Sequence, residues 1–228
     1  MLGDELAGLH PRLRAYFSAI PAGHHGFGWG VFDSVGTPRR WLWPALAVFA
    51  RAHVIFPVWE RAVPFTVVNR PTVDASGREA VIAVRTFLLR SGTRRMVDEI
   101  AVANRRQGDG PGEGHDEGAG AALVDRLGSP ALLETALEAT VDSGALSLRS
   151  TMVTFRVGRR RIPLPRSIAP RVVLTESFDD DADAQRVEIA VVAPLIGTIY
   201  EYAGMFQYEI RPGEPSVVDE PSGRESGE

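Results

Sequence analysis

The sequence predicts an α+β fold: a mainly antiparallel, strongly curved sheet or open barrel of about nine or ten strands, with two helices near the N-terminus. From residue 63 onward, short segments alternate apolar and polar side chains, as half-buried strands do. Turn residues at 74–77 and 142–144 separate neighbouring segments, and strands joined by short turns pair antiparallel. No strand–helix alternation is present, so a parallel nucleotide-binding sheet is not expected. Curving the sheet around a core would bury its apolar face.

The two helices are predicted at residues 10–20 and 39–56. The apolar residues of the first share one face: Leu13, Tyr16, Phe17 and Ile20. Proline ends each segment, at Pro21 and Pro57. A core-packing role is the simplest interpretation of the second helix. A lid, or peripheral contact of residues 41–56 with a lipid surface, is the alternative.

The strands follow in order. At 27–31, large apolar residues alternate with glycines, which indicates a bend or a close backbone approach. The next strands are expected at 63–70, 79–90, 96–106 and 145–157, and then on both sides of an acidic turn and after a Pro-Leu-Ile-Gly break, within 172–210. Residues 131–141 fit a helix by period and a strand by position. Residues 107–120 are rich in glycine and are predicted to form a flexible loop.

Composition limits the classes of protein. The 228 residues suit one β-rich domain, residues 1–210, followed by a disordered acidic tail at 211–228. Cysteine is absent, which excludes disulfides and thiol chemistry and fits the cytoplasm. All 25 basic residues are arginine, as codon bias in a GC-rich bacterium would give, so lysine chemistry is excluded too. A net charge of −4 argues against nucleic acid, and neither a secretory signal nor a transmembrane segment is visible.

Glu176 is the strongest site candidate. Strand alternation places it on one face with Val172, Leu174 and Phe178, so it is a buried carboxylate if that face is the core. A buried lone charge must be paired or take up a proton. Arg85 lies on the apolar face of its own predicted strand and is the best partner, because arginine can clamp a carboxylate. Solvent-facing positions for both residues are the alternative.

Three more residues are candidates for a ligand site or for buried polar positions. Asp125 lies in the apolar segment 123–128 beside Arg126, where a structural ion pair is the simpler interpretation. Tyr200 and Tyr202 share one face of the closing strand, and their hydroxyls could bond a mostly apolar ligand or simply lie at the rim of the core. The scattered histidines and the aspartates of 179–183 lack the spacing of metal ligands, so neither a metal nor a cofactor is expected.

Several motifs occur in an order that resembles a bacterial family catalogued as domain of unknown function 4166. They include GFGWGVFD, VPFTV, VRTF, LVDRLG, RIPLP, the Glu176 strand with its acidic turn, and PLIGTIYEYAGMF. The resemblance covers about residues 9–210, and it implies a domain found alone or C-terminal to saccharopine-dehydrogenase-like oxidoreductases. It carries no activity and no catalytic residue, and residues 107–120 look like an insertion relative to it.

The sequence therefore predicts a non-catalytic domain that binds an apolar or lipid-like small molecule in a cavity of the sheet, with Arg85, Glu176 and Tyr202 as polar anchors. One alternative is an accessory module that binds an oxidoreductase, which rests on the resemblance alone. The other is an enzyme that uses Glu176 as a general acid or base, with its pKa raised by burial.

Overall fold

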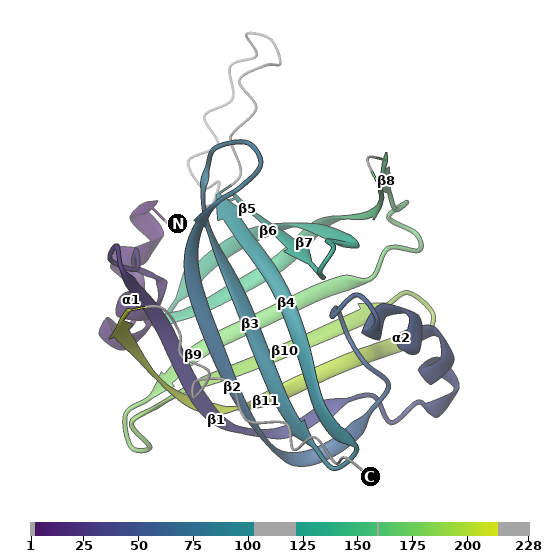
Figure 1. Cartoon of the computed structure of the whole chain (residues 1–228), viewed down its shortest axis with the longest axis horizontal. Helices are drawn as coiled ribbons and strands as arrows, with labels where there is room; N and C mark the ends of the chain where they lie inside the picture. The colour runs from purple at the N-terminus through teal and green to yellow at the C-terminus, as the bar shows by residue number, and fades with distance from the viewer. Residues whose placement is uncertain (1–2, 103–121, 159, 214–228) are drawn as a thin grey trace, which may run out of the picture.

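Ten strands close into an antiparallel barrel, and one further short strand extends it (Figure 1). The computed structural model describes residues 3–102, 122–158 and 160–213. Each barrel strand pairs with its neighbour in the sequence, except that β8 lies outside the ring and β7 pairs directly with β9. Pairing of β6 with β7 and of β1 with β11 completes the circle. The predicted curved antiparallel sheet is confirmed, and the sheet closes.

The barrel strands are β1 (His24–Gly36), β2 (Trp59–Val73), β3 (Glu79–Leu89), β4 (Gly92–Val102), β5 (Ala122–Leu127), β6 (Leu133–Asp142), β7 (Ala145–Val157), β9 (Arg171–Asp179), β10 (Ala184–Ala193) and β11 (Gly197–Pro212). The extra strand β8 (Arg160–Pro163) pairs with the end of β7. The α-helices are α1 (Pro11–Phe17) and α2 (Trp43–Ala50), and 3-10 turns span Gly3–Gly8 and Arg40–Leu42.

The elements differ from the sequence prediction in several places. The first helix, predicted at 10–20, spans Pro11–Phe17. The ambiguous segment 131–141 is strand β6, because pairing with both β5 and β7 outweighs its helical period. The second helix is shorter than 39–56: it begins at Trp43 and ends at Ala50, and the chain then turns toward β2. Residues 211 and 212, predicted to start the tail, belong to β11. The glycine-rich loop 107–120 and the tail from 214 lie outside the described residues.

Glycines in β1 allow the neighbouring strands β2 and β11 to come close. A Cβ atom on Gly30 would lie 2.1 Å from the carbonyl oxygen of Met205, and one on Gly28 would lie 2.7 Å from a methyl group of Val67. The side chains between the glycines point outward, so Trp29 and Val31 are 37% and 46% exposed. The close approach predicted from the alternating glycines is therefore present at the seam of the barrel.

The interior contains two apolar clusters. The larger is aromatic and gathers side chains from β1, β2, β3 and β11, among them Phe32, Phe65 and Phe87. The smaller is aliphatic and includes Leu13 of α1 together with Leu146 and Leu148 of β7. Burial of these side chains is the main favourable contribution to folding.

The two helices lie toward opposite sides of the barrel in Figure 1. Leu13 is fully buried and fixes α1 on the aliphatic cluster. Leu46 does the same for α2 on the aromatic cluster, while much of the rest of that helix stays exposed. Within the described part of the chain, neither helix has the length and apolar character needed to span a bilayer.

Candidate functional site

Inward-facing polar side chains from several strands gather inside the barrel. They follow from strand alternation: Arg85 lies between the buried Ala83 and Phe87 on β3. The same rule turns inward Asp98 of β4, Asp125 of β5, Glu176 of β9 and Gln185 of β10. We call Arg85, Asp98, Asp125 and Glu176 the ion cluster.

Arg85 forms its ion pair with Asp98, one strand away. Asp98 is 3% exposed, and the Arg85 side chain is 15% exposed, so the pair is shielded from water. Burial acts to lower the pKa of Arg85, but the charge of Asp98, together with smaller contributions from Tyr202, Tyr16 and Asp125, outweighs burial, and the pKa is raised. Burial raises the pKa of Asp98 in spite of the guanidinium. The guanidinium of Arg85 is therefore charged, and it is ion-paired with the carboxylate of Asp98.

Glu176 is 5% exposed and accepts a hydrogen bond from the Gln185 amide of the neighbouring strand. Burial raises its pKa from 4.5 to about 7, although the charge of Arg85 and the bond from Gln185 both act to lower it. The expected direct Arg85–Glu176 pair is thus replaced by Arg85–Asp98 and Gln185–Glu176. Both residues do face inward, as predicted, and Arg85 acts on Glu176 through its charge.

Asp125 is the least compensated member of the ion cluster. Its Oδ1 atom is inaccessible to water and has no hydrogen-bond partner among the described residues. Burial raises the pKa of Asp125 well above its usual value, and the charge of Asp98 raises it further, while Arg85 opposes both. An uncompensated carboxylate in such surroundings takes up a proton. Burial therefore favours the neutral form of Asp125.

The charges of the ion cluster do not balance. Among the residues that the structure describes, one guanidinium faces the carboxyl groups of Asp98, Asp125 and Glu176, and it is paired with Asp98. Full ionisation would bury two negative charges without cations, at a cost of several kcal/mol each. The interior therefore favours protons, hydrogen-bond donors or a cation over any further anion. The pKa of Glu176, about 7, lies near neutral pH.

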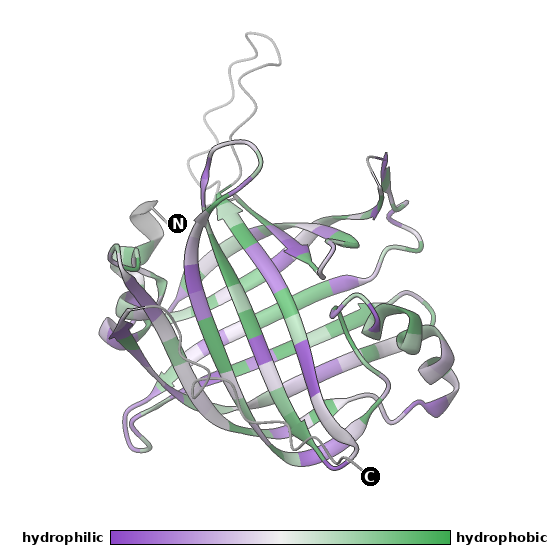
Figure 2. Ribbon diagram, viewed as in Figure 1, coloured by the Kyte–Doolittle hydropathy of each residue, from purple (hydrophilic) through white to green (hydrophobic). Residues whose placement is uncertain are grey.

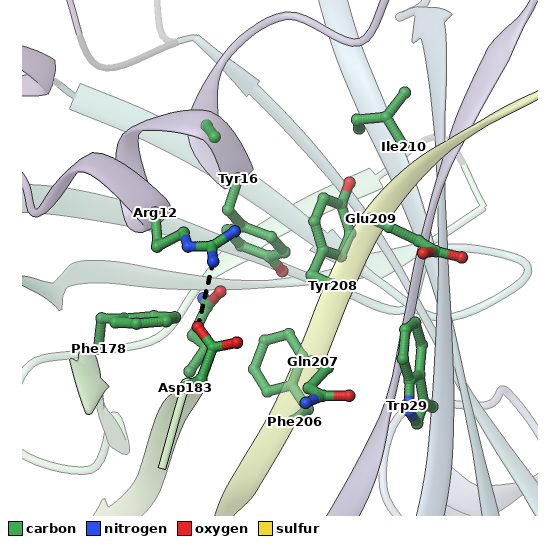
Figure 3. A pocket seen from close by; sticks show the side chains of 12 residues that line it. Arg12, Tyr16, Trp29, Phe178, Asp183, Phe206, Gln207, Tyr208, Glu209 and Ile210 are labelled. Carbon is green, nitrogen blue, oxygen red and sulfur yellow. Dashed lines mark hydrogen bonds and ion pairs between the residues drawn. The ribbon is translucent and has the colours of Figure 1, made fainter. Parts of the chain in front are cut away.

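A pocket of about 350 Å³ opens beside α1 (Figure 3). Its lining includes Tyr16 of α1, Phe206 and Tyr208 of β11, and Gln185. Gln185 is 4% exposed, so the amide that bonds Glu176 lies at the base of the pocket. At the rim, Arg12 of α1 donates to Asp183 over 3.2 Å. Glu176 is thus hydrogen-bonded to a side chain of the pocket lining.

The pocket exists because β10 is shorter than β11 on this side. The pairing of β10 with β11 begins at Gln185 and Phe206, whereas β11 continues along β1 as far as Pro212. Helix α1 occupies the space beyond, where the Tyr16 ring packs edge-on to Tyr208 at 4.5 Å and to Phe206 at 5.9 Å. The wall of the barrel here consists of side chains rather than paired backbone.

The remaining predicted candidates have different positions. Tyr202 is 3% exposed and its pKa is raised to about 12, first by burial, with Arg85 acting to lower it. Tyr200 packs in the aromatic cluster against Phe56, with ring centroids 6.0 Å apart. The expected pairing of Asp125 with Arg126 does not form, because Asp125 faces inward and Arg126 bonds Glu99, Asp74 and Glu134.

Sequence reasoning missed Asp98, Gln185 and Tyr16 as parts of the site. Alternation gives a clear signal for Asp98, since Met96, Asp98 and Ile100 share one face of β4. Tyr16 was identified as an apolar helix residue, and its role at the pocket depends on where α1 docks. Within the described ranges, no group of three or more histidine, aspartate or glutamate residues could hold a metal ion.

The fold and the site together define a closed antiparallel β-barrel protein with a buried, carboxyl-rich interior beneath a side pocket. The profile of the domain of unknown function DUF4166 matches residues 9–206. The chain belongs to this family. It is 27% identical over 207 residues to the uncharacterized protein YndH of Bacillus subtilis (strain 168), an alignment that covers 89% of this chain and 92% of YndH. No solved structure matches the chain.

Proposed function

We propose that the barrel binds a small, largely apolar molecule whose polar end reaches the ion cluster through the pocket beside α1. The observation that carries this proposal is the position of Gln185, which lines the pocket and bonds the buried Glu176. Binding pockets for small molecules are mostly apolar, with a few convergent polar groups, and range upward from about 300 Å³. The pocket of about 350 Å³ combines aromatic walls with a few polar side chains, among them Arg12, Asp183 and Gln185.

The charge imbalance specifies the polar end of the ligand. A carboxylate would add a negative charge near Asp98, Asp125 and Glu176, and Arg85 is already paired. A hydroxyl or an amine could instead donate to Glu176 or to the unpartnered Oδ1 of Asp125. We therefore propose a neutral or cationic amphiphile rather than a fatty acid.

A matched ligand series tests the proposal. Dodecanol, dodecylamine and dodecanoic acid share one chain length and differ in the polar end, and isothermal titration calorimetry below their aggregation concentrations compares them. The alcohol and the amine should bind at least tenfold more tightly than the acid. Equal affinities, or the tightest binding by the acid, would contradict the proposed site.

A pocket-filling variant locates the binding. Ala15 is exposed on α1 and lines the pocket, so Ala15→Trp fills the pocket without touching the ion cluster. Ala19, also exposed and just beyond α1, is outside the pocket lining and provides the matched control Ala19→Trp. Binding should be lost in the first variant and kept in the second. Equal binding by both would place the ligand elsewhere.

An enzymatic role for Glu176 is a second candidate, favoured by its pKa of about 7, which suits a general acid or base near neutral pH. In the described structure Gln185 lies between Glu176 and the pocket, so a substrate would have to displace that amide. Loss of ligand turnover, with binding retained, in Glu176→Gln would support catalysis. A role as an accessory module of an oxidoreductase remains a hypothesis from the family resemblance.

A further inference from the structure

The end of the barrel that carries α2 brings together several connections. The link between β1 and β2 forms α2, and the chain just after it bonds two other parts of this end. The Ser129 amide donates to the Ala52 carbonyl over 2.9 Å, and the Val97 amide donates to the His53 carbonyl over 2.9 Å. The β7–β8 hairpin adjoins α2 through the Phe49 and Phe155 rings, whose centroids are 6.0 Å apart. Figure 1 shows β8 and α2 toward the same side of the barrel.

The described residues of these connections, 37–58, 90–91, 128–132, 158 with 160–170, and 194–196, include no aspartate or glutamate. They do include exposed arginines: Arg39, Arg40, Arg51, Arg90, Arg160, Arg161 and Arg166. Arg161 is partly neutralised, because it bonds Glu134 at the start of β6. At the opposite end, the turn between β9 and β10 contains Asp180, Asp181 and Asp183. A chain of net charge −4 thus has one strongly basic end.

The same end exposes large apolar side chains. Trp41 is 63% exposed, Val48 is 57% exposed, and Leu195, in the turn between β10 and β11, is 107% exposed. On the β8 side, Ile162 and Ile168 are 50% and 62% exposed. Single exposed apolar residues are ordinary, but a surface helix normally carries a polar outer face. Helix α2 has none, since its sequence is apolar throughout, and Figure 2 shows it as mostly hydrophobic.

Arginines and apolar side chains alternate closely on this surface. The guanidinium of Arg40 lies 5.6 Å from the ring centroid of Trp43, and Arg39 approaches the β10–β11 turn near Gly197. At the other end of α2, Arg51 lines a groove of about 570 Å³ together with Arg94 and Arg95 of β4. A surface patch with an apolar centre and a basic rim is complementary to the surface of an anionic bilayer. Its apolar side chains can enter the region between headgroups and acyl chains, and its cations can contact the headgroups.

We infer that the α2 end of the barrel docks on an anionic lipid bilayer, with Trp41 and Leu195 entering the interface and the arginines contacting phosphate headgroups. Tryptophan prefers this depth because its ring is apolar and its N–H is polar. Each basic side chain near an anionic surface contributes about 1 kcal/mol. The inference is independent of the ligand proposed for the interior, because none of its residues belongs to the pocket beside α1.

Vesicle binding tests the inference with the full chain. Co-sedimentation with vesicles of phosphatidylglycerol and phosphatidylcholine should exceed that with pure phosphatidylcholine at least tenfold, and added salt should weaken it. The triple variant Arg39→Gln/Arg40→Gln/Arg51→Gln should reduce the partition coefficient by about fivefold per arginine, or on the order of a hundredfold. The matched control Arg14→Gln/Arg149→Gln/Arg186→Gln makes the same change in net charge away from α2 and should keep binding within about threefold.

Depth of insertion gives a second readout. Brominated lipids should quench the fluorescence of the wild-type protein, and Trp41→Phe should remove most of that quenching while keeping partition within about threefold. Val73 is also 63% exposed but lies at the other end of the barrel, so Val73→Ser should leave partition unchanged, whereas Leu195→Ser should weaken it several-fold. Equal binding to neutral and anionic vesicles, an equal loss in the control triple variant, or tighter binding to DNA than to vesicles would overturn the inference.

Discussion

Replacing Glu176 by glutamine should make the protein more stable at alkaline pH. In the unfolded chain this carboxyl ionises near 4.5, and in the barrel burial raises its pKa to about 7. Between these values the folded protein holds a proton that the unfolded chain has lost. Raising the pH through this window therefore favours unfolding, and the loss is complete above pH 7.

The size of the effect follows from the two pKa values. The difference between about 7 and 4.5, at about 1.4 kcal/mol per pH unit, corresponds to about 3 kcal/mol. Glutamine has the same shape and no charge, and its carbonyl can still accept the bond from Gln185. The variant should match the wild-type protein near pH 4.5 and exceed its free energy of unfolding by about 3 kcal/mol at pH 8.

Urea unfolding at pH values from 4.5 to 8.5 measures this difference. The comparison of the two proteins is essential, because Asp98 and Asp125 also have raised pKa values and make the wild-type profile fall in the same direction. Glu188 on β10 has a 53% exposed side chain, so Glu188→Gln should differ from wild type by less than about 0.5 kcal/mol throughout. Parallel profiles for Glu176→Gln and wild type would refute the reasoning.

Two further predictions concern the ion cluster and the seam. Arg85→Met should lower the free energy of unfolding by about 3–5 kcal/mol, measured by urea unfolding. In double-mutant cycles, the coupling energy of Arg85→Met with Asp98→Asn should exceed its coupling energy with Glu176→Gln. Equal coupling energies would contradict the assignment of Asp98 as the direct partner of Arg85. Gly30→Ala should destabilise the barrel by about 1–3 kcal/mol, because its Cβ meets the backbone of β11, whereas Val31→Ala on the exposed face should cost less than about 1 kcal/mol. If Gly30→Ala unfolds thermally at the same midpoint temperature as the wild-type protein, the prediction is wrong and β11 can shift to accommodate the added Cβ.

Much of the barrel follows from the sequence because strand alternation and turn residues are local signals. The hairpin of β2 and β3 and the bounds of β7 follow from those signals alone. Closure could not be predicted, since it depends on pairing between β6 and β7 and between β1 and β11 in three dimensions. The segment 131–141 shows the same limit: its helical period is real, but two neighbouring strands decide its conformation.

The sequence predicted that Arg85 and Glu176 face inward, but it did not predict which side chains they contact. Alternation turned Arg85 and Glu176 inward correctly, because each strand has only two faces. The choice of partner needed the strand order: β4 adjoins β3, so Asp98 reaches Arg85 first, and β10 adjoins β9, so Gln185 reaches Glu176. Neither contact could be read without knowing which strands are neighbours.

Because of the strand order, the largest single loss of loop-closure entropy on folding occurs when β1 pairs with β11. Nearly every pairing joins segments that are close in sequence, but β1 must find β11, with Gly26 opposite Ile210. Loop closure over such a separation is costly and slows folding. The two strands also end side by side, where the Gly213 amide donates to the Gly23 carbonyl over 2.7 Å. A circular permutant that joins residue 228 to residue 1 and opens the chain at Ser91 would keep α1 and make β11 and β1 close neighbours in sequence.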